Sequence, residues 1–564
     1  MRPVNRALSA IVLLAFAVRV WGIHFGLPLT VCRPDENLVV QPALEYFGGD
    51  FDPQFYAYGT LGSYLLHALM RVQFCFEYLR GNCPDTQTFV RAALVDPGHW
   101  YLVARCLGMA AGVATIWVVH RLASELGGRT AGLCAAFLLA LCFLHARDSH
   151  FGTLDVLATL FTTSSVWLAI AALRTGKLRT LLFAALCGGL AAATKYGGGL
   201  ALLSVLAASL VQQPIGWRAR ASRFALVVLV GTLAFFAAMP YAALNSTAVL
   251  AALRTESEHL AQGGGLDLGP GWWRHLSFTL AHGMGLPLLA AALVGAWVLV
   301  RGSRPRALVF FAFPLVYFAL AGSGRTVFVR YMLPLTPILC VLAGLFAARF
   351  GEALRARGRA HAGLATAGLV ALLAALPAWS LLQFDRLLAR ADTRLEARAW
   401  LIQNAAQGSS VAQPPGFART QLPADLETRE RAFQAWSKLT SDRSIAARME
   451  RMRVPPLQEL EGAGYGTRRW IEQRNAFAGD GGAPSAEPDY VVVSASPLAL
   501  FDPPTPSGLA RVLSERYALA ASFVASDAQA VAESYDPLDQ FYLPYSSFRG
   551  VARPGPNLEI WARK

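Results

Sequence analysis

Apolar runs long enough to cross a lipid bilayer recur along the 564-residue chain up to about residue 384. A helix of about 20 apolar residues spans the hydrocarbon core of a membrane. Backbone polar groups inside lipid must be hydrogen-bonded within the chain, which leaves helical bundles and closed barrels as the available folds. Runs of this length predict helices, so we expect a polytopic α-helical membrane protein. The eleven candidate spans are residues 7–28, 104–120, 130–146, 154–173, 180–194, 197–213, 223–242, 277–300, 307–321, 329–348 and 362–382.

Basic residues are distributed unevenly among the linkers between these spans. Arginine and lysine gather in every second linker, and the first such group lies at residues 2–6, before the first span. Cytoplasmic linkers carry this excess, so an odd number of spans predicts a cytoplasmic N-terminus and an extracytoplasmic C-terminal segment. The same distribution accounts for the net charge of +14, which in a soluble protein would suggest nucleic-acid binding. We expect membrane lipid as a partner and no nucleic acid.

The composition changes after residue 384, where runs of spanning length end and Pro, Asp, Glu, Ser and Arg become frequent. We predict a membrane domain over residues 1–384 and a soluble domain of ordinary size over residues 385–564. Within the soluble domain, Thr393–Asn404 has the periodicity of an amphipathic helix, while Tyr490–Ser494 and Leu558–Trp561 are typical of strands. We expect a small α/β domain that recognises the acceptor or packs over the outer loops.

Four basic residues break the alternation, because they lie in linkers predicted to be external: Arg147, Lys195, Arg325 and Arg330. A basic side chain near a helix end can extend to the membrane surface, which is the ordinary explanation for any one of them. Ionisable groups at membrane depth usually face a wet cavity, so several cations on one outer face favour an anion site. A phosphate at the bilayer surface is the natural anion.

The longest linker of the membrane half covers residues 29–103 and is predicted to be external. It contains the acidic pair Asp35-Glu36, an amphipathic stretch at Leu38–Phe47, and a helix over residues 61–79 that lies on the membrane rather than through it. Long external loops more often carry functional residues than serve only as connections. Any two of its three cysteines could form a disulfide; these are Cys32, Cys75 and Cys83.

Carboxylates and cations on one face suit a particular class of reaction. Transferring a sugar to a hydroxyl or amine requires a base that removes the acceptor's proton. A lipid-phosphate leaving group requires cations rather than an acid. One carboxylate beside a basic cluster therefore favours inverting transfer from a lipid-linked donor, whereas retaining hydrolysis requires two carboxylates across one bond. Asp155, which starts the fourth span, is a second candidate carboxylate, although the helix dipole also explains an acid there.

No motif in the sequence indicates a metal or nucleotide site. Asp50-Phe51-Asp52 has a DxD pattern, but no nucleotide-binding βαβ unit accompanies it. We expect no required cofactor, and a divalent metal is not indicated. The external segment 243–275 contains glycines and the pair Trp272-Trp273, which we regard with Tyr58 as candidates for a mobile lid or an acceptor contact. Ordinary interfacial tryptophans explain the pair equally well.

Seven short motifs follow one another along the chain: Pro34-Asp35-Glu36, Tyr58–Leu66, Ala146–Phe151 with Asp155, Ala193–Tyr196, Arg330–Leu335, Asp392–Arg394 and Arg553–Pro556. In this order they resemble the protein O-mannosyltransferase/aminoarabinose transferase group of GT-C membrane glycosyltransferases, which includes many bacterial phospholipid carrier-dependent enzymes. The resemblance covers the membrane half and the edges of the C-terminal domain. It implies a GT-C fold with about eleven transmembrane helices.

The resemblance also implies roles for individual residues. Asp35 matches the base that deprotonates the acceptor, with Glu36 beside it, and Asp155 matches a second carboxylate that shapes the site. Arg147 and Lys195 match ligands of the donor phosphate, with assistance from Arg325 or Arg330. Gly59-Thr60 stands where these proteins usually have two prolines, which leaves the geometry of that segment open.

We therefore predict an inverting glycosyltransferase that moves a single sugar from a polyprenyl-phosphate donor to a protein, lipid or glycan acceptor. The reaction would take place on the periplasmic face of a bacterial cytoplasmic membrane. A lipid or anion transporter is the alternative; it predicts an inverted repeat, and the sequence has no clear one. A catalytically inactive scaffold is a third hypothesis, against which Asp35, Arg147 and Lys195 speak.

Overall fold

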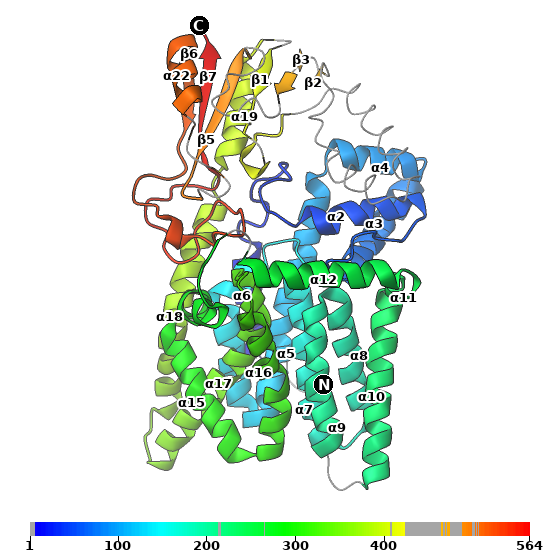
Figure 1. Ribbon diagram of the computed structural model, residues 1–564. Helices are drawn as coiled ribbons and strands as arrows, with labels where there is room; N and C mark the ends of the chain where they lie inside the picture. The colour runs from blue at the N-terminus through cyan, green and yellow to red at the C-terminus, as the bar shows by residue number, and fades with distance from the viewer. Residues whose placement is uncertain are drawn as a thin grey trace. The chain divides into compact units, whose positions relative to one another are not determined.

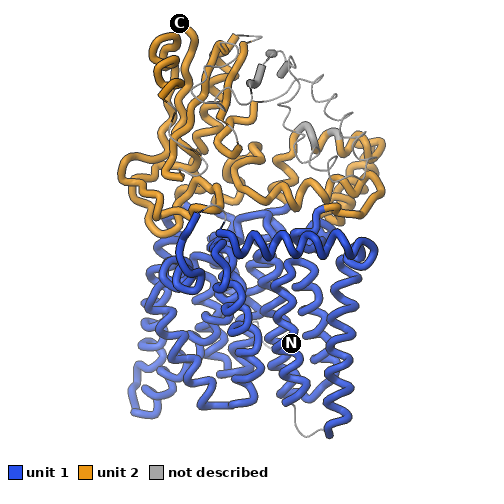
Figure 2. The backbone as a smooth tube through the Cα atoms, viewed as in Figure 1, with its two compact units in different colours: residues 1–21, 55–65, 104–385 blue, residues 22–54, 66–103, 386–564 orange. Residues whose placement is uncertain are grey.

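The structure is a computed structural model that describes residues 6–211, 216–263, 266–406, 409–414, 416–422, 464–465, 468–469, 471–473, 488–498, 502, 505 and 507–564. The chain divides into two compact units (Figure 2). Unit 1 consists of Met1–Trp21, Phe55–Leu65 and Ala104–Asp385, and unit 2 of Gly22–Gln54, Leu66–Val103 and Arg386–Lys564. Most of the long first linker thus shares a compact unit with the C-terminal residues.

Unit 1 is a bundle of helices (Figure 1). Its long helices are α1 (Arg6–Val20), α5 (Gly98–Ala140, which begins in unit 2), α7 (Asp155–Thr175), α8 (Leu178–Thr194), α9 (Leu202–Val211), α10 (Trp217–Ala238), α12 (Ser246–Gln262), α15 (Leu286–Gly302), α16 (Arg304–Ser323), α17 (Thr336–Ala356) and α18 (Ala362–Leu388). Short helical segments connect them: α6 (Phe143–Asp148), η2 (Tyr196–Ala201), α11 (Tyr241–Leu244), α13 (Gly271–Arg274), the π-helix η4 (His275–Leu280), α14 (Ala281–Met284) and η5 (Val329–Leu335).

Within the described residues, six helices are long and apolar enough to cross a membrane, or seven if the bent pair Gly271–Met284 and Leu286–Gly302 forms one span. The prediction of a multi-pass helical membrane protein is confirmed. Each of the eleven predicted spans contains a helix, and α5 contains two of them, joined across a non-helical break at Gly127 and Gly128. Large apolar side chains on these helices are exposed, as lipid-facing residues of a membrane bundle are; examples are Leu229, Leu233, Leu293 and Trp297.

The first span was predicted too long. The helix α1 ends at Val20 rather than at residue 28. Gly22 and Gly26 have φ angles of 84° and 67°, in the left-handed region that a helix cannot continue through. The candidate span at 277–300 is similarly interrupted at Gly285, whose φ is 84° and where the chain bends by 105°.

Glycines allow close contacts between helices in unit 1. A Cβ atom on Gly295 of α15 would lie 1.9 Å from the carbonyl oxygen of Leu342 in α17, and one on Gly189 of α8 would lie 2.3 Å from that of Gly231 in α10. Small residues let helix backbones approach closely where lipid supplies no hydrophobic force between helices. These two crossings therefore depend on the absence of a side chain.

Unit 2 contains helices from the first linker: α2 (Asn37–Glu45), the 3-10 turn η1 (Tyr46–Gly48), α3 (Leu61–Leu79, which begins in unit 1) and α4 (Thr86–Val95). The predicted helix over residues 61–79 coincides with α3. Among the described residues no disulfide forms, so the structure lacks the one considered for the first linker. Cys32 instead donates a hydrogen bond to the carbonyl of Gly26, at 3.5 Å.

The C-terminal part of unit 2 is a small α/β domain, as predicted. Its five-stranded sheet has the order β4 (Ile471–Gln473), β1 (Ser410–Ala412), β5 (Tyr490–Ala495), β7 (Asn557–Arg563), β6 (Tyr517–Phe523). β1 is parallel to both of its neighbours, whereas β7 is antiparallel to β5 and β6. A separate hairpin pairs β2 (Gly464–Tyr465) with β3 (Arg468–Arg469).

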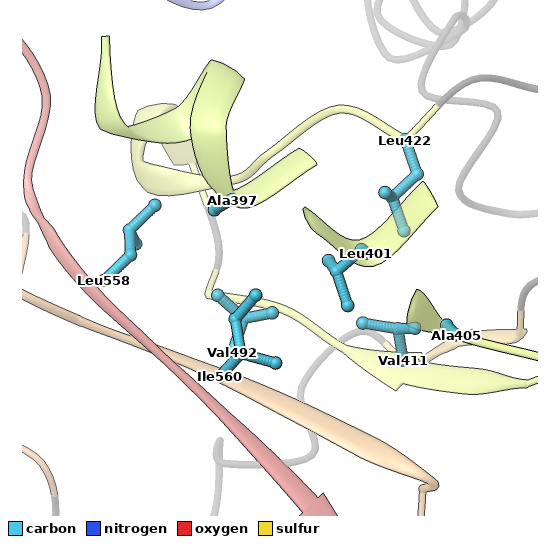
Figure 3. Close-up of a cluster of buried hydrophobic side chains, with 8 residues drawn as sticks. All are labelled: Ala397, Leu401, Ala405, Val411, Leu422, Val492, Leu558 and Ile560. Atoms are coloured by element: carbon cyan, nitrogen blue, oxygen red, sulfur yellow. The ribbon is translucent and has the colours of Figure 1, made fainter. Parts of the chain in front are cut away.

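The helix α19 (Thr393–Asn404) has the bounds predicted from its periodicity, and it covers this sheet. Its Ala397 and Leu401 pack against Val492 of β5 and against Leu558 and Ile560 of β7 (Figure 3). A second helix, α22 (Ser507–Arg516), contributes Leu509 and Leu513 to another buried cluster of the sheet. The sequence also predicts disordered stretches around residues 409–425 and 478–488, which lie partly outside the described residues.

The Gly295 contact predicts a specific loss of stability. Gly295→Ala would force α15 and α17 apart, so the free energy of unfolding should fall by about 1–3 kcal/mol. Gly368→Ala in α18 is the matched control, because a Cβ there would have no other part of the protein within 4 Å apart from the helix's own backbone and the neighbouring residues. The control should be neutral or stabilise by up to about 1 kcal/mol. Thermal unfolding in detergent measures both variants; equal midpoints would contradict the packing argument.

Candidate active site

Unit 1 contains a cavity of about 330 Å³. Four charged side chains line it, two cationic and two anionic: Lys195, Arg330, Asp155 and Glu256. Leucines from several helices complete much of its wall: Leu200, Leu253, Leu260 and Leu320. The cavity therefore combines a charged part with an apolar part, an arrangement that suits an amphiphilic ligand.

Asp155 and Lys195 form an ion pair at the cavity wall, with 2.6 Å between Lys195 Nζ and Asp155 Oδ1. Asp155 is the first residue of α7, and Lys195 follows the last residue of α8 in an extended conformation. The Asp155 side chain is 7% exposed and that of Lys195 22%, so the ammonium is the more accessible partner. The pair connects two neighbouring helices and leaves part of the lysine facing outward.

Tyr58 lies beside this pair, its ring centroid 5.1 Å from Lys195 Nζ, which is a cation–π contact. The next residue, Gly59, fits against α8 so closely that a Cβ atom would lie 2.0 Å from the carbonyl oxygen of Ala193. Thr60 donates a hydrogen bond to the carbonyl of Ala238, at 2.8 Å. Gly59 and Thr60, which stand where the family usually has two prolines, therefore hold this segment against α8 and α10.

Arg330 belongs to η5, is buried, and stacks its guanidinium carbon 4.2 Å from the centroid of the Phe328 ring. The adjacent Tyr331 accepts a hydrogen bond at its carbonyl from the hydroxyl of Tyr317, at 2.8 Å. Both tyrosines line the same cavity as Arg330. Two of the four predicted phosphate ligands, Lys195 and Arg330, therefore come together.

The other two predicted cations do not line this cavity. Arg147 is buried and paired with its neighbour Asp148, with 2.9 Å between Nη1 and Oδ2. Its guanidinium also lies 5.3 Å from the centroid of the Phe151 ring. Arg325 is exposed, and its backbone N–H donates to the carbonyl of Leu260 at 2.9 Å. A position in a linker predicted to be external did not by itself distinguish these arginines from Lys195 and Arg330.

The predicted lid segment reaches the cavity through α12 rather than through its tryptophans. Glu256 and Ser257 of α12 line the cavity, whereas Trp272 and Trp273 do not. Trp272 donates its indole N–H to the carbonyl of Ala319 at 3.1 Å, and both rings remain substantially exposed. The sequence analysis did not single out Glu256; the available signal was a carboxylate on an amphipathic helix within the predicted lid segment.

Asp35 and Glu36 belong to unit 2. Asp35 has a φ of 69°, a left-handed conformation that Asp adopts more readily than most residues but that still costs energy. Its carbonyl accepts from Leu38 N–H, and the Glu36 carbonyl accepts from Val39 and Val40 N–H, so the pair begins α2. Asp35 is partly exposed, while Glu36 is fully buried.

Within the part of the chain that the structure describes, no group of three His, Cys, Asp or Glu side chains could hold a metal ion. The expectation that no cofactor is required stays a prediction.

Comparison with known proteins extends this description. Residues 93–242, which include Arg147, Asp155 and Lys195, match the family of dolichyl-phosphate-mannose-protein mannosyltransferases. A comparison with curated proteins found no match.

Two solved structures have a similar fold. ArnT from Cupriavidus metallidurans, bound to undecaprenyl phosphate, is 13% identical and has a TM-score of 0.53; the match covers 98% of this chain and 97% of that one. The Archaeoglobus fulgidus oligosaccharyltransferase in its apo form is also 13% identical, with a TM-score of 0.50; that match covers 99% of this chain and 88% of the other. The predicted GT-C fold and the family resemblance are confirmed.

The Asp155–Lys195 pair makes a prediction about stability. Removing the lysine takes the opposite charge away from a mostly buried carboxylate, and breaking buried pairs costs about 3–5 kcal/mol. Because Lys195 is partly exposed, we expect Lys195→Met to lower the free energy of unfolding by roughly 1–3 kcal/mol. Adding Asp155→Asn should recover much of this loss. Thermal unfolding of the single and double variants measures the coupling; additive effects would argue against it.

Proposed function

We propose that this protein is a glycosyltransferase that moves one sugar, with inversion, from a polyprenyl-phosphate donor to an acceptor at the outer face of the membrane. The observation that carries the proposal is the cavity of unit 1, where Lys195 and Arg330 meet a leucine-lined wall. A lipid phosphate has the matching parts, an anionic group and an apolar chain.

The two cations suit a phosphate leaving group. Arg and Lys form strong, charge-assisted hydrogen bonds to phosphate oxygens. When the bond between the sugar C1 and the phosphate oxygen breaks, its electron pair leaves with the phosphate, and preorganised cations stabilise the charge that develops. Asp155 supports this role by orienting the Lys195 ammonium, since its Oδ1 lies 2.6 Å from Lys195 Nζ. ArnT, whose fold this chain shares, was solved with undecaprenyl phosphate bound, which supports this class of donor.

Asp35 is the proposed base. Its carboxylate would accept the proton of the acceptor hydroxyl or amine as that oxygen or nitrogen attacks C1 from the face opposite the phosphate. Of the acidic pair, Asp35 is the partly exposed member, whereas Glu36 is buried at the start of α2. We therefore assign proton transfer to Asp35 and a supporting position to Glu36. Asp155 remains the partner of Lys195 rather than a second base.

We place the reaction on the periplasmic side of a bacterial cytoplasmic membrane. The alternating basic linkers support a cytoplasmic N-terminus and an external position for the linkers that contain Lys195 and Arg330. The acceptor is a protein, a lipid or a glycan. A transporter of the same lipid would use a similar cavity, but it would release the lipid-linked sugar with its sugar–phosphate bond intact. Turnover by the purified protein therefore distinguishes the two functions.

The first prediction concerns Asp35. Asp35→Asn should abolish transfer, because an amide cannot accept the acceptor's proton, while the folded state is retained. Transfer of a labelled sugar from a polyprenyl-phosphate donor measures activity, and thermal unfolding measures folding. Asp85→Asn is the matched control: Asp85 lies in the same external linker and caps α4, a role that Asn also performs. Wild-type turnover by Asp35→Asn would remove Asp35 from the mechanism.

The second prediction concerns the cations. Lys195→Ala and Arg330→Ala should each raise the donor KM or weaken polyprenyl-phosphate binding by about 10-fold or more, since each loses a charged hydrogen bond to phosphate. Arg325→Ala is the control, because Arg325 lies five residues before Arg330 but outside the cavity. Titration with polyprenyl phosphate measures binding. Equal binding by all three variants would locate the donor phosphate elsewhere.

A further inference from the structure

The loop that leads to Asp35 is held at three points by residues of the C-terminal domain. Thr30, Val31 and Arg33 each contact a side chain from residues 386–564, and all of these residues belong to unit 2. None of these contacts has a part in the chemistry proposed above. Two motifs singled out in the sequence, Asp392–Arg394 and Arg553–Pro556, are involved.

The first point of contact is a buried ion pair between Arg33 and Asp539, with 3.0 Å between Nη1 and Oδ2. Both side chains are at most 1% exposed. The Arg33 guanidinium also lies 5.2 Å from the centroid of the Phe541 ring. Buried ion pairs add little net stability over apolar packing, and their best-attested use is to fix one arrangement among alternatives. Arg33 precedes Asp35 by two residues.

The second point is a pair of hydrogen bonds between Thr30 and Gln421. The Thr30 backbone N–H donates to Gln421 Oε1 at 2.7 Å, and Gln421 Nε2 donates to Thr30 Oγ1 at 2.9 Å. The amide of Gln421 thus binds both the backbone and the side chain of one loop residue, which defines the position of that residue more strictly than a single bond.

The third point is Arg394, which is buried and donates to the Val31 carbonyl at 3.4 Å and to the Phe417 carbonyl at 2.7 Å. Asp392 holds this guanidinium with both carboxylate oxygens, accepting from Nε at 2.8 Å and from Nη2 at 2.6 Å. The Tyr542 ring lies 5.3 Å from its central carbon. Arg394 therefore has one well-defined orientation toward the loop.

The second motif fixes the backbone from which Arg394 extends. Thr393 donates its N–H to the Pro554 carbonyl at 3.1 Å and its hydroxyl to the Pro556 carbonyl at 2.7 Å. Gly555 between them has a φ of 102°, and a Cβ there would lie 2.1 Å from Thr393 Oγ1. Arg553 adds an ion pair with Glu396, one turn into α19. The two motifs therefore pack against each other and together fix the start of α19.

We propose that Gln421, Arg394 and Asp539, here called the C-terminal clamp, are positioning residues that hold the Asp35 loop in its reactive conformation. Ordinary domain packing would explain apolar contacts, but these are an ion pair and hydrogen bonds that converge on the residues before Asp35. The left-handed backbone of Asp35 persists only if its surroundings determine it strongly. The inference rests on the proposed function, and it assigns the C-terminal domain a role in the rate of transfer.

Asp539→Asn in the full-length protein is the principal test. The amide keeps the shape but loses the charge that Arg33 pairs with, so residues 29–36 should exchange amide hydrogens faster. The kcat for transfer should fall about 10- to 100-fold, as small misplacements of catalytic groups do. The donor KM should remain near the wild-type value, because the donor cations are unaffected. Asp539→Glu, which keeps the charge, should recover part of kcat.

Gln421→Asn provides a milder second variant in case loss of the buried charge prevents folding. It shortens the side chain that binds Thr30 and should produce the same pattern with a smaller decrease in kcat. Glu515→Gln, at an exposed position of α22, is the matched control and should leave both kcat and exchange unchanged.

The outcomes separate the clamp from the proposed function. Unchanged exchange over residues 29–36 in Asp539→Asn and Gln421→Asn, or an unchanged kcat, overturns the clamp even if Asp35→Asn is inactive. Faster exchange together with lower kcat supports it. If Asp35→Asn retains full activity, the proposed base is wrong; faster loop exchange in Asp539→Asn would then still support the structural clamp, but not its role in catalysis.

Discussion

The ion pair between Asp155 and Lys195 is the interaction on which the site in unit 1 depends. Charges inside an apolar helical bundle must be paired or face water. This pair joins the start of α7 to the residue after α8, and it forms part of the cavity wall. The close fit of Gly59 against Ala193 then places Tyr58 beside Lys195. One contact between two helix ends thus fixes the position of the Lys195 ammonium in the cavity wall.

The sequence predicted much of this fold for identifiable reasons. Apolar length located the spans, and periodicity located α19 with its observed bounds. The sequence did not predict where α1 ends. Two glycines with positive φ interrupt the helix, while the apolar run itself remains long enough to span a membrane. Charge alternation identified four unusual cations but could not select Lys195 and Arg330, since Arg147 takes a partner from the adjacent residue. Glu256 was missed because α12 has an ordinary amphipathic pattern.

In the C-terminal domain, polar contacts likewise fix the position of a loop. Its motifs had no assigned chemistry in the sequence, yet Thr393 and Gly555 meet in one tight junction. From that junction Arg394 extends toward the loop of Asp35, where Asp539 and Gln421 add further contacts. Fold similarity to ArnT establishes the GT-C architecture, whereas these contacts belong to this chain's own side chains. The domain is therefore better viewed as support for the acidic loop than as an appendage.

The central claim is that a lipid-phosphate sugar bond is broken with inversion at C1. The most direct measurement is the anomeric configuration of the product that the purified protein makes from a polyprenyl-phosphate sugar of known configuration, determined by NMR. A single carboxylate base and a phosphate leaving group predict the inverted product. Retention of configuration would contradict the mechanism, and recovery of the intact lipid-linked sugar after incubation with acceptors of every class would contradict glycosyl transfer itself.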